Sequence, residues 1–454
     1  MEARNKDTSA APSSGESVAT KLFRIAEKAR KEPGFQFTSL FHLMNEDLLR
    51  ECFQHLRKDA AAGIDKMTKE MYAEHLEANL ANLVERLQRM AYRPQPVRRK
   101  YIPKPGSSKQ RPLGIPSFED KLVQAGLVRI LESVYELDFI ADSYGFRPHR
   151  SCHDALRALS KAVEDSPTNH IVEADIKGFF DNVDQEWLLK FLAHRIADKR
   201  IQRMVKRFLR AGVAEDGSVT ISEMGTPQGG VISPLLANIY LHYALDLWFE
   251  RVFRKSCTGF ARLIRYADDF VVCFQYKADA ARIHQELGVR LGKFMLEVEP
   301  TKTKVMEFGR FAVHNAKKRG KRAETFDFLG LTHYCGTRKD GKGFRMKRVT
   351  ARKKLNAKLK IFKEWLKRAR TLKTRELWKT AKTKLQGHYN YYGVTDNLRG
   401  IVRFGEAVKK LLFKWLNRRG RKNCLNWEKF NEMLKRFPLP KPRIRVNLFA
   451  FSVK

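Results

Sequence analysis

The feature that most constrains this chain is a pair of adjacent aspartates, Asp268 and Asp269, between two short apolar runs. The run 261–266 leads into the pair and the run 270–274 leads out of it, and both have the length and composition of buried strands. This order predicts a hairpin with two carboxylates at its tip. An isolated Asp-Asp pair is more often an exposed turn than a site, but apolar runs on both sides favour acids at the ends of buried strands.

A third aspartate has a similar setting. Asp175 lies near the end of the short β-branched run 171–176, which suits another buried strand. If the strands lie side by side, Asp175, Asp268 and Asp269 converge. Carboxylates at short range repel one another when no cation is present, and their oxygens are the ligands that Mg²⁺ prefers. The sequence therefore predicts a magnesium site, and two ions held in this way would suit nucleotidyl transfer.

The rest of the chain alternates helical and extended patterns, which predicts an α+β fold with a sheet domain flanked by helical ones. Apolar residues recur at helical spacing within 20–95, and the extended segment 97–116 is broken at a Pro105-Gly106 turn. The other segments with helical patterns are 120–135, 185–211, 277–294 and, with basic and aromatic residues mixed, 349 onward.

The net charge of +39 is concentrated in the last third of the chain. Residues 301–454 contain 44 Lys and Arg against 10 Asp and Glu, a net of +34, whereas residues 1–300 have a net charge of only +5. An excess of this size repels itself on folding unless a polyanion is the usual partner. Nucleic acid is the leading candidate. An anionic membrane surface is the weaker one, because no separate basic amphipathic anchor is found.

Several classes of protein are disfavoured by what the sequence lacks. No run of about 18 apolar residues predicts a membrane span, and 1–17 is polar, without the apolar core of a secretory signal. The six cysteines are scattered, with no Cys-x-x-Cys spacing that would predict a zinc ribbon or a zinc-bound nuclease motif. A reducing cytoplasm is therefore expected.

Further blocks accompany Tyr266-Ala267-Asp268-Asp269. In chain order they are Ile102-Pro103-Lys104-Pro105, Lys109-Gln110-Arg111-Pro112-Leu113-Gly114-Ile115-Pro116, Ser143-Tyr144-Gly145-Phe146-Arg147-Pro148, Ala174-Asp175-Ile176-Lys177-Gly178-Phe179-Phe180-Asp181, Gly225-Thr226-Pro227-Gln228-Gly229-Gly230, Ser233-Pro234-Leu235-Leu236-Ala237-Asn238 and Phe328-Leu329-Gly330. Together these blocks resemble reverse transcriptases. They are most similar to the bacterial group II intron-encoded reverse transcriptase–maturases, over about residues 40–400.

The resemblance implies an RNA-directed DNA polymerase with a two-metal mechanism. Asp175, Asp268 and Asp269 match the metal-binding triad, which would hold two Mg²⁺ ions that Mn²⁺ could replace. Asp269 is expected to support the site more than to ligate. Phe180 matches the ring that blocks a ribose 2′-hydroxyl and so favours deoxynucleotides; the alternative is a phenylalanine of the core.

Other site residues follow from the same blocks. The expected nucleotide-binding residues are Lys104, Arg111, Phe180 and Gln228. The expected template–primer contacts are Gly229, Gly230, Lys302 and Lys304. Arginine suits a triphosphate because its fork of donors matches phosphate oxygens, and glycine lets backbone approach nucleic acid closely. For the lysines and the arginine, plain surface charge is the alternative.

The segment Gly387-His388-Tyr389-Asn390-Tyr391-Tyr392-Gly393 resembles the core of the maturase domain in the same family. Aromatic faces stack on unpaired bases while nearby Lys and Arg hold phosphate. Tyr389, Tyr391 and Tyr392 are therefore expected to bind RNA, with packing of a helical core as the alternative for each. The family often adds a zinc-dependent endonuclease with paired cysteines; because Cys424 is the single cysteine of the last 100 residues, that domain is expected to be absent.

The resemblance implies a right-hand polymerase: fingers, a palm with an antiparallel sheet, a helical thumb and a basic maturase or RNA-binding domain. The expected divisions are a flexible tail at 1–19, an N-terminal extension and the start of the fingers at 20–95, fingers and palm at 96–335, the thumb and the start of the maturase domain at 336–400, and a basic RNA- or DNA-binding region at 401–454.

The expected reaction is attack of a primer 3′-hydroxyl on a deoxynucleoside triphosphate, copying RNA, with a second role in binding structured intron RNA and assisting its splicing. The expected partners are this intron RNA, an RNA template with a DNA primer, dNTPs and target DNA for retrotransposition, in a bacterial cytoplasm near the nucleoid. No membrane partner is expected, and the oligomeric state is not predicted. Three alternatives stay open: a host-recruited reverse transcriptase acting in defence or DNA repair, a non-enzymatic splicing factor, and an RNA-dependent RNA polymerase.

Overall fold

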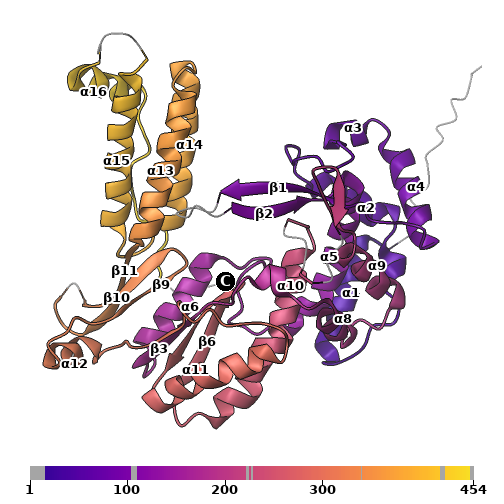
Figure 1. Ribbon diagram of the computed structural model, residues 1–454, viewed down its shortest axis with the longest axis horizontal. Coiled ribbons are helices and arrows are strands. Elements are labelled where there is room, and N and C mark those ends of the chain that lie inside the picture. Colours follow the sequence, from indigo (N-terminus) through magenta and orange to yellow (C-terminus); the bar gives the residue numbers. More distant parts are fainter. Residues whose placement is uncertain are drawn as a thin grey trace, which may run out of the picture.

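The computed structural model describes residues 16–103, 110–220, 224–225, 229–338, 340–419 and 425–449. The chain forms three parts: a set of mostly N-terminal helices, a central four-stranded sheet with its helices, and long C-terminal helices that follow a small sheet. Figure 1 shows the N-terminal helices at one side of the molecule, the C-terminal helices at the other, and the central sheet below and between them.

The N-terminal helices pack around α5 (Phe118–Asp138), which is apolar on most sides, so that Leu122, Leu127 and Ile130 are fully buried. Polar caps start most of these helices: the side chain of Ser117 accepts the backbone N–H of Asp120 at the start of α5. The other helices of this part are α1 (Val18–Lys31), the 3₁₀ turn η1 (Phe41–Leu43), α2 (Glu46–His55), α3 (Lys69–Ala73), α4 (Leu76–Gln88), α8 (Gln185–Ala193) and α9 (Lys199–Leu209).

Two hairpins join into a small sheet beside these helices. β1 (Val97–Pro103) and β2 (Gln110–Ile115) pair antiparallel, and β1 also pairs in parallel with β4 (Val213–Glu215), which pairs with β5 (Ser218–Thr220). The turn expected at Pro105-Gly106 lies outside the described residues. In Figure 1 the β1–β2 hairpin extends from the N-terminal helices toward the C-terminal ones.

The central sheet has the strand order β6-β7-β3-β8, and each neighbouring pair is antiparallel. Val172 and Val272 face a core shared with the N-terminal helices, whereas Ile171 and Val271 face a core shared with the C-terminal part. Because both faces are covered, apolar residues of β3 and β7 point to both sides of the sheet. The elements of this part are α6 (Cys152–Glu164), β3 (His170–Ala174), α7 (Phe179–Asn182), α10 (Ser233–Leu241), the π-helical segments η2 (His242–Asp246) and η3 (Phe249–Phe253), the 3₁₀ turn η4 (Arg254–Ser256), β6 (Ala261–Tyr266), β7 (Asp269–Phe274), α11 (Lys277–Gly292) and β8 (Lys304–Glu307).

The C-terminal part begins after α12 (Ala312–Lys318) with an antiparallel sheet of β9 (Thr325–Phe328), β10 (Leu331–Thr337) and β11 (Phe344–Thr350). Three long helices follow, and they stand side by side in Figure 1. Trp378 is buried among them and donates its ring N–H to the backbone carbonyl of Phe437 at 2.5 Å. The three long helices are α13 (Arg352–Ala369), α14 (Thr374–Tyr392) and α15 (Leu398–Leu416), and the shorter α16 (Trp427–Arg436) lies at the far end.

The mixture of helices and sheets agrees with the predicted class, and the strands around the three aspartates lie where the apolar runs predicted them. Two boundaries differ from the expected divisions. α1 begins at Val18, within the expected tail, and the division expected between 335 and 336 falls inside β10. None of the helices in the described ranges is both long and apolar enough to span a bilayer.

Candidate active site

β6 and β7 form a hairpin whose two-residue turn is Ala267-Asp268, because Tyr266 pairs with Asp269 across it. Ala267 has a positive φ of 57°. A positive φ at the first residue of a two-residue turn is the type II′ pattern, which matches the twist of paired strands. Space beside the turn is narrow, since a Cβ on Gly145 would collide with the backbone of Ala267. Asp268 therefore lies at the tip of the hairpin, and Asp269 opens β7.

The third predicted acid lies beside this turn. Ala174 of β3 pairs with Phe270 of β7, so the next step along the two antiparallel strands brings Asp175 beside Asp269. The backbone carbonyl of Asp175 accepts the N–H of Glu299 at 2.8 Å, which fixes the chain just beyond β3. The structure therefore brings Asp175, Asp268 and Asp269 together at one end of the central sheet.

The electrostatics of this end reflect crowding of negative charge. Burial raises the pKa of Asp268, and the charge of Asp175 raises it further. Burial also raises the pKa of Asp269 to about 6, with added contributions from Asp268 and Asp175. Asp269 is nevertheless exposed to solvent, because it lines an open pocket. Ionised acids this close are costly unless a cation joins them.

Lys302 supplies a positive charge at this point. Its Nζ donates to the carboxylate of Asp175, and this bond raises the pKa of Lys302. The Lys302 side chain is 58% exposed, so it can leave the carboxylate without disturbing a core. Lys304, which was predicted with it, lies on β8 opposite Glu173 and is exposed.

Glu173 is an acid of this region that the sequence patterns did not single out. It lies two residues before Asp175 in an extended segment, so both side chains point to the same face of the sheet. Burial raises the pKa of Glu173 to about 7, and the charges of Asp327, Asp269 and Asp175 add to the effect. An acid inside an otherwise apolar strand was the signal that could have identified it.

The donor type suits Mg²⁺, because the three aspartates offer hard carboxylate oxygens and the ammonium of Lys302 already stands in for a cation at Asp175. Over the ranges that the structure describes, no three His, Cys, Asp or Glu side chains converge closely enough to hold a metal ion. The residues therefore fit an ion in chemistry and in charge, and the carboxylates would have to move closer together to hold one.

Two of the four predicted nucleotide-binding residues, Lys104 and Gln228, lie outside the described residues. Arg111 lies on β2, opposite Ile102, and its positive charge opposes the rise in the pKa of Asp268. Phe180 is half-buried, with its ring centroid 5.3 Å from that of Phe179 and 6.5 Å from that of the exposed Phe146. The Phe180 ring thus lies at the border of a core, with one neighbour at the surface.

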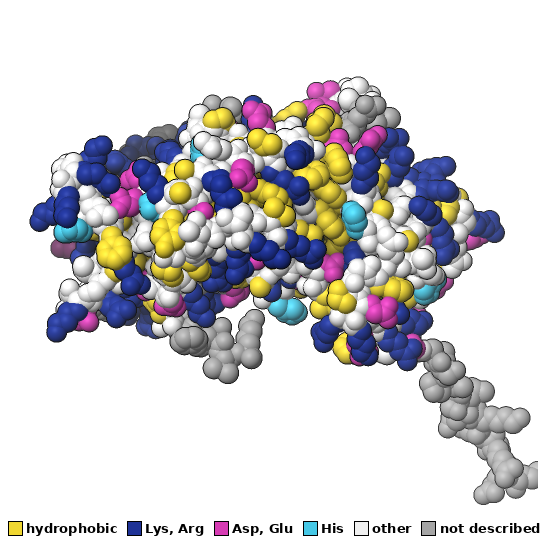
Figure 2. Space-filling model, turned by 90° about the horizontal axis from the view of Figure 1, so that it is seen from below, with side chains coloured by type: hydrophobic (Ala, Val, Ile, Leu, Met, Phe, Trp, Pro, Cys, Tyr) yellow, Lys and Arg dark blue, Asp and Glu magenta, His cyan; other side chains and the backbone are white. Residues whose placement is uncertain are grey.

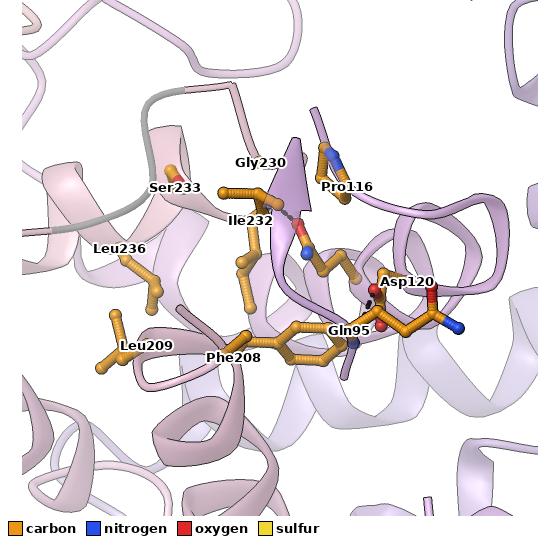
Figure 3. A pocket seen from close by; sticks show the side chains of 12 residues that line it. Gln95, Pro116, Asp120, Phe208, Leu209, Gly230, Ile232, Ser233 and Leu236 are labelled. Atoms are coloured by element: carbon orange, nitrogen blue, oxygen red, sulfur yellow. Dashed lines mark hydrogen bonds between the residues drawn. The ribbon is translucent and has the colours of Figure 1, made fainter. Parts of the chain in front are cut away.

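The glycines of the loop before α10 pack against the protein itself. Gly229 has a φ of 113°, and a Cβ there would lie 2.6 Å from the carbonyl oxygen of Gly114 on β2. Gly230 is buried and lines a cavity of about 10 Å³, room for about one water molecule. Figure 3 shows this cavity between Gly230 and Ile232 on one side and Gln95 and Asp120 on the other. Gly229 is the exposed one of the two predicted glycines, whereas Gly230 is buried.

A larger open pocket of about 670 Å³ lies between the turn and helices α13 and α14, with Tyr266 and Asp269 at one wall. Tyr391 lines it, is 37% exposed, and donates its hydroxyl to the carbonyl of Leu329 at 3.1 Å. Tyr389 and Tyr392 are only 1% and 5% exposed and belong to the C-terminal core. Rings this buried present little face to a base, so the expectation that Tyr389 and Tyr392 stack on RNA is corrected: both side chains pack the core, although Tyr392 also lines the pocket.

Comparison with known proteins identifies a family for the chain. A model of the family described as "Reverse transcriptase (RNA-dependent DNA polymerase)" matches residues 102–333. Group II intron-encoded protein LtrA of Lactococcus lactis subsp. cremoris is 40% identical over 222 residues, which are 49% of this chain and 37% of that protein. Protein YkfC of Escherichia coli (strain K12) is 33% identical over 316 residues, 62% of this chain and 83% of that protein. Nuclear intron maturase 2, mitochondrial, of Arabidopsis thaliana is 30% identical over 173 residues, 29% of this chain and 23% of that protein.

The extent of these matches differs. The chain spans little more than a third of the length of LtrA but most of YkfC. The family model spans about half of the chain, from β1 to β10, and includes β3, β6 and β7, the strands that bring the three aspartates together. The chain belongs to the reverse transcriptase (RNA-dependent DNA polymerase) family.

Proposed function

We propose that the protein is an RNA-directed DNA polymerase in which Asp175 and Asp268 ligate two Mg²⁺ ions and Asp269 supports them. The observation behind this proposal is that the strand register places the three aspartates at one end of the central sheet, with the pKa of Asp268 and Asp269 raised. When bound, the ions would activate the primer 3′-hydroxyl and neutralise charge on the triphosphate, and Mn²⁺ could replace them.

The protein's own side chains would position the reactants. Arg111 would hold the triphosphate through its planar fork of donors, and the ring of Phe180 would exclude a ribose 2′-hydroxyl. Lys302 would exchange the carboxylate of Asp175 for a primer phosphate. The proposed further contacts are Lys104 and Gln228 to the nucleotide, and Gly229 and Lys304 to the template and primer.

In this proposal the N-terminal helices and the β1–β2 hairpin are the fingers, the central sheet is the palm, and α13 with α14 begins the thumb. The duplex would lie across the 670 Å³ pocket beside Asp269, where Lys354, Lys358 and Lys384 offer ammonium groups to phosphate. Such sequence-independent contacts are the usual source of affinity for nucleic acid.

Primer extension on poly(rA)/oligo(dT) with Mg²⁺ tests the polymerase proposal. The wild type should extend the primer, and Asp268→Asn should lower the rate by about 1,000-fold, because it removes one ligand charge from the site. Glu85→Gln is the matched control, since Glu85 is a surface acid of α4 that pairs with Arg89. Template–primer binding by Asp268→Asn should persist. No product from the wild type would sink the proposal.

We also propose that the basic C-terminal region binds structured group II intron RNA, assists its splicing and so supports retrotransposition into target DNA. The Lys and Arg side chains of α13 are exposed along its length, and residues 301–454 have a net charge of +34. In Figure 2, Lys and Arg side chains are spread over the face seen from below. The printed names of LtrA and of the Arabidopsis maturase refer to introns, which favours this RNA over others.

RNA binding at two or more salt concentrations tests the second proposal. Affinity for a group II intron RNA should exceed affinity for an unrelated RNA of equal length, and both should fall steeply with salt. Equal affinities at every salt concentration would reduce the proposal to non-specific binding. A gain in the rate of intron splicing on adding the protein would be the positive result for maturase activity.

A further inference from the structure

A buried ion pair lies directly under the Ala267-Asp268 turn. Arg265 and Asp246 both have no exposed surface. Nε and Nη2 of Arg265 donate to the two carboxylate oxygens of Asp246 at 2.8 and 2.5 Å, the bidentate geometry that gives a guanidinium a fixed orientation. Nη1 donates to Oδ1 of Asn238 at 3.0 Å and to the backbone carbonyl of Ala267 at 2.9 Å. The guanidinium therefore holds the peptide group that immediately precedes Asp268.

Asn238 extends this network to another segment of the chain. Its Nδ2 donates to the carbonyl of Gly145 at 2.7 Å, and Gly145 is the residue whose missing side chain lets it approach the backbone of Ala267. Ser143 forms an isolated bridge with Arg265 itself. Helix α10, the loop 143–145 and the hairpin are thus fixed to one another around a single guanidinium.

The helical segment after α10 explains why Asn238 and Asp246 both reach Arg265. Two turns of α-helix take about seven residues. In a regular α-helix Asn238 and Asp246, which are eight residues apart, would therefore point in directions that differ by almost a quarter of a turn. η2 is π-helical, with i→i+5 hydrogen bonds and therefore more residues in each turn. The wider turn returns Asp246 to the face of Asn238, and both acceptors point at one arginine. π-Helical segments are frequent at functional sites.

We propose that Arg265 is a positioning residue of the polymerase site: held by Asp246 and Asn238, it fixes the Ala267 carbonyl and so the direction in which Asp268 meets a metal ion. This inference rests on the proposed polymerase function. Stability alone is a weak reason for the pair, because a buried ion pair is often no better than packed apolar residues. Lysine has no planar fork and cannot hold Asp246, Asn238 and Ala267 in the same geometry.

Arg265→Lys tests the inference, with Arg195→Lys as the matched control. Arg195 is also buried and pairs with an acid, Asp138, at 2.9 Å, but it lies among the N-terminal helices. Both variants should lose thermal stability. Mn²⁺ binding, measured by electron paramagnetic resonance with poly(rA)/oligo(dT) present, should weaken by about 10-fold in Arg265→Lys, the scale of losses around metal ligands, and stay unchanged in Arg195→Lys. The half-saturating Mg²⁺ concentration for extension should rise by a similar factor.

Asn238→Ser is the milder variant, because it keeps the ion pair and breaks the link to Gly145. It should weaken Mn²⁺ binding less than Arg265→Lys does. If Arg265→Lys does not fold, Asn238→Ser is the variant that tests the inference. Mn²⁺ affinities of these variants equal to that of Arg195→Lys would overturn the inference. A wild type that binds Mn²⁺ but extends no primer would overturn the polymerase function. The Mn²⁺ affinities of the variants would still test whether Arg265 positions Asp268. A wild type without Mn²⁺ affinity would overturn both.

Discussion

Two segments that resemble family motifs differ in how the fold exposes their side chains. They are the turn Tyr266-Ala267-Asp268-Asp269 and the stretch 387–393, most of which lies in α14. At the turn, the backbone is fixed from beneath by Arg265, and Asp268 and Asp269 lie at the end of the sheet. In α14, the helical period turns Tyr389 and Tyr392 into the core and leaves Tyr391 at the surface. A motif at the end of a strand exposes its side chains, whereas a motif inside an amphipathic helix has an inward half. The functional interpretation of a motif therefore depends on the element in which it lies.

The largest expected effect comes from removing a tyrosine ring that α14 buries in the core. Tyr389→Ala should lower the free energy of unfolding by about 3–5 kcal/mol, the usual cost of emptying a buried aromatic site. Tyr391→Ala should cost much less, since 37% of Tyr391 is exposed, and should instead weaken RNA binding. Urea denaturation and RNA titration of both variants measure this. Similar stability losses for the two would show that the inside and outside assignments are wrong.

A second prediction concerns the candidate active site, to which the turn Tyr266-Ala267-Asp268-Asp269 belongs. Phe180→Ala should raise the use of ribonucleotides relative to deoxynucleotides by about 10-fold or more, because the ring no longer excludes a 2′-hydroxyl. Phe146→Ala is the control: Phe146 is the exposed neighbour of Phe180, and its removal should leave the selectivity unchanged. Single-nucleotide incorporation with dNTP and rNTP measures the ratio. If the ratio does not rise, Phe180 belongs to the core and is no steric gate.

The smallest expected effect concerns the charge crowding at the turn. An acid with a raised pKa in the folded state destabilises the protein above that pKa and has no effect below its unfolded pKa, near 4. For Asp269, whose pKa is about 6, Asp269→Asn without Mg²⁺ should melt about 1–2 °C above the wild type at pH 7.5. The gap should close as the pH falls through 6 toward 4. Thermal unfolding across this range measures it; a gap that persists at pH 4 would point to packing and not to ionisation.

Local patterns predicted the hairpin and the strand before Asp175 because acids end apolar runs there. They did not predict the register, since nothing in 171–176 says that β3 pairs with β7. The strands of 325–350 were not recognised, because basic residues interrupt the apolar alternation of β11. The network of Arg265, Asp246 and Asn238 had no local signal at all: its members lie 19 and 27 residues apart along the chain and meet only in the folded protein.

The tyrosines of α14 were a different kind of miss, because the information was present. Leu385, Tyr389 and Tyr392 follow one another at helical spacing and are buried together. The same spacing leaves Tyr391 on the other side. Periodicity, applied within the motif, separates the core tyrosines from the exposed one.

The ion pair between Lys302 and Asp175 makes one carboxylate the target of two competing cations. If Mg²⁺ binds Asp175 as proposed, it must displace the ammonium, and a primer phosphate that takes up the ammonium removes the competitor. By reciprocity, primer and metal then raise each other's affinity by the same factor. The protein without nucleic acid would be a weak binder of magnesium, and the arrival of the substrate would itself complete the metal site.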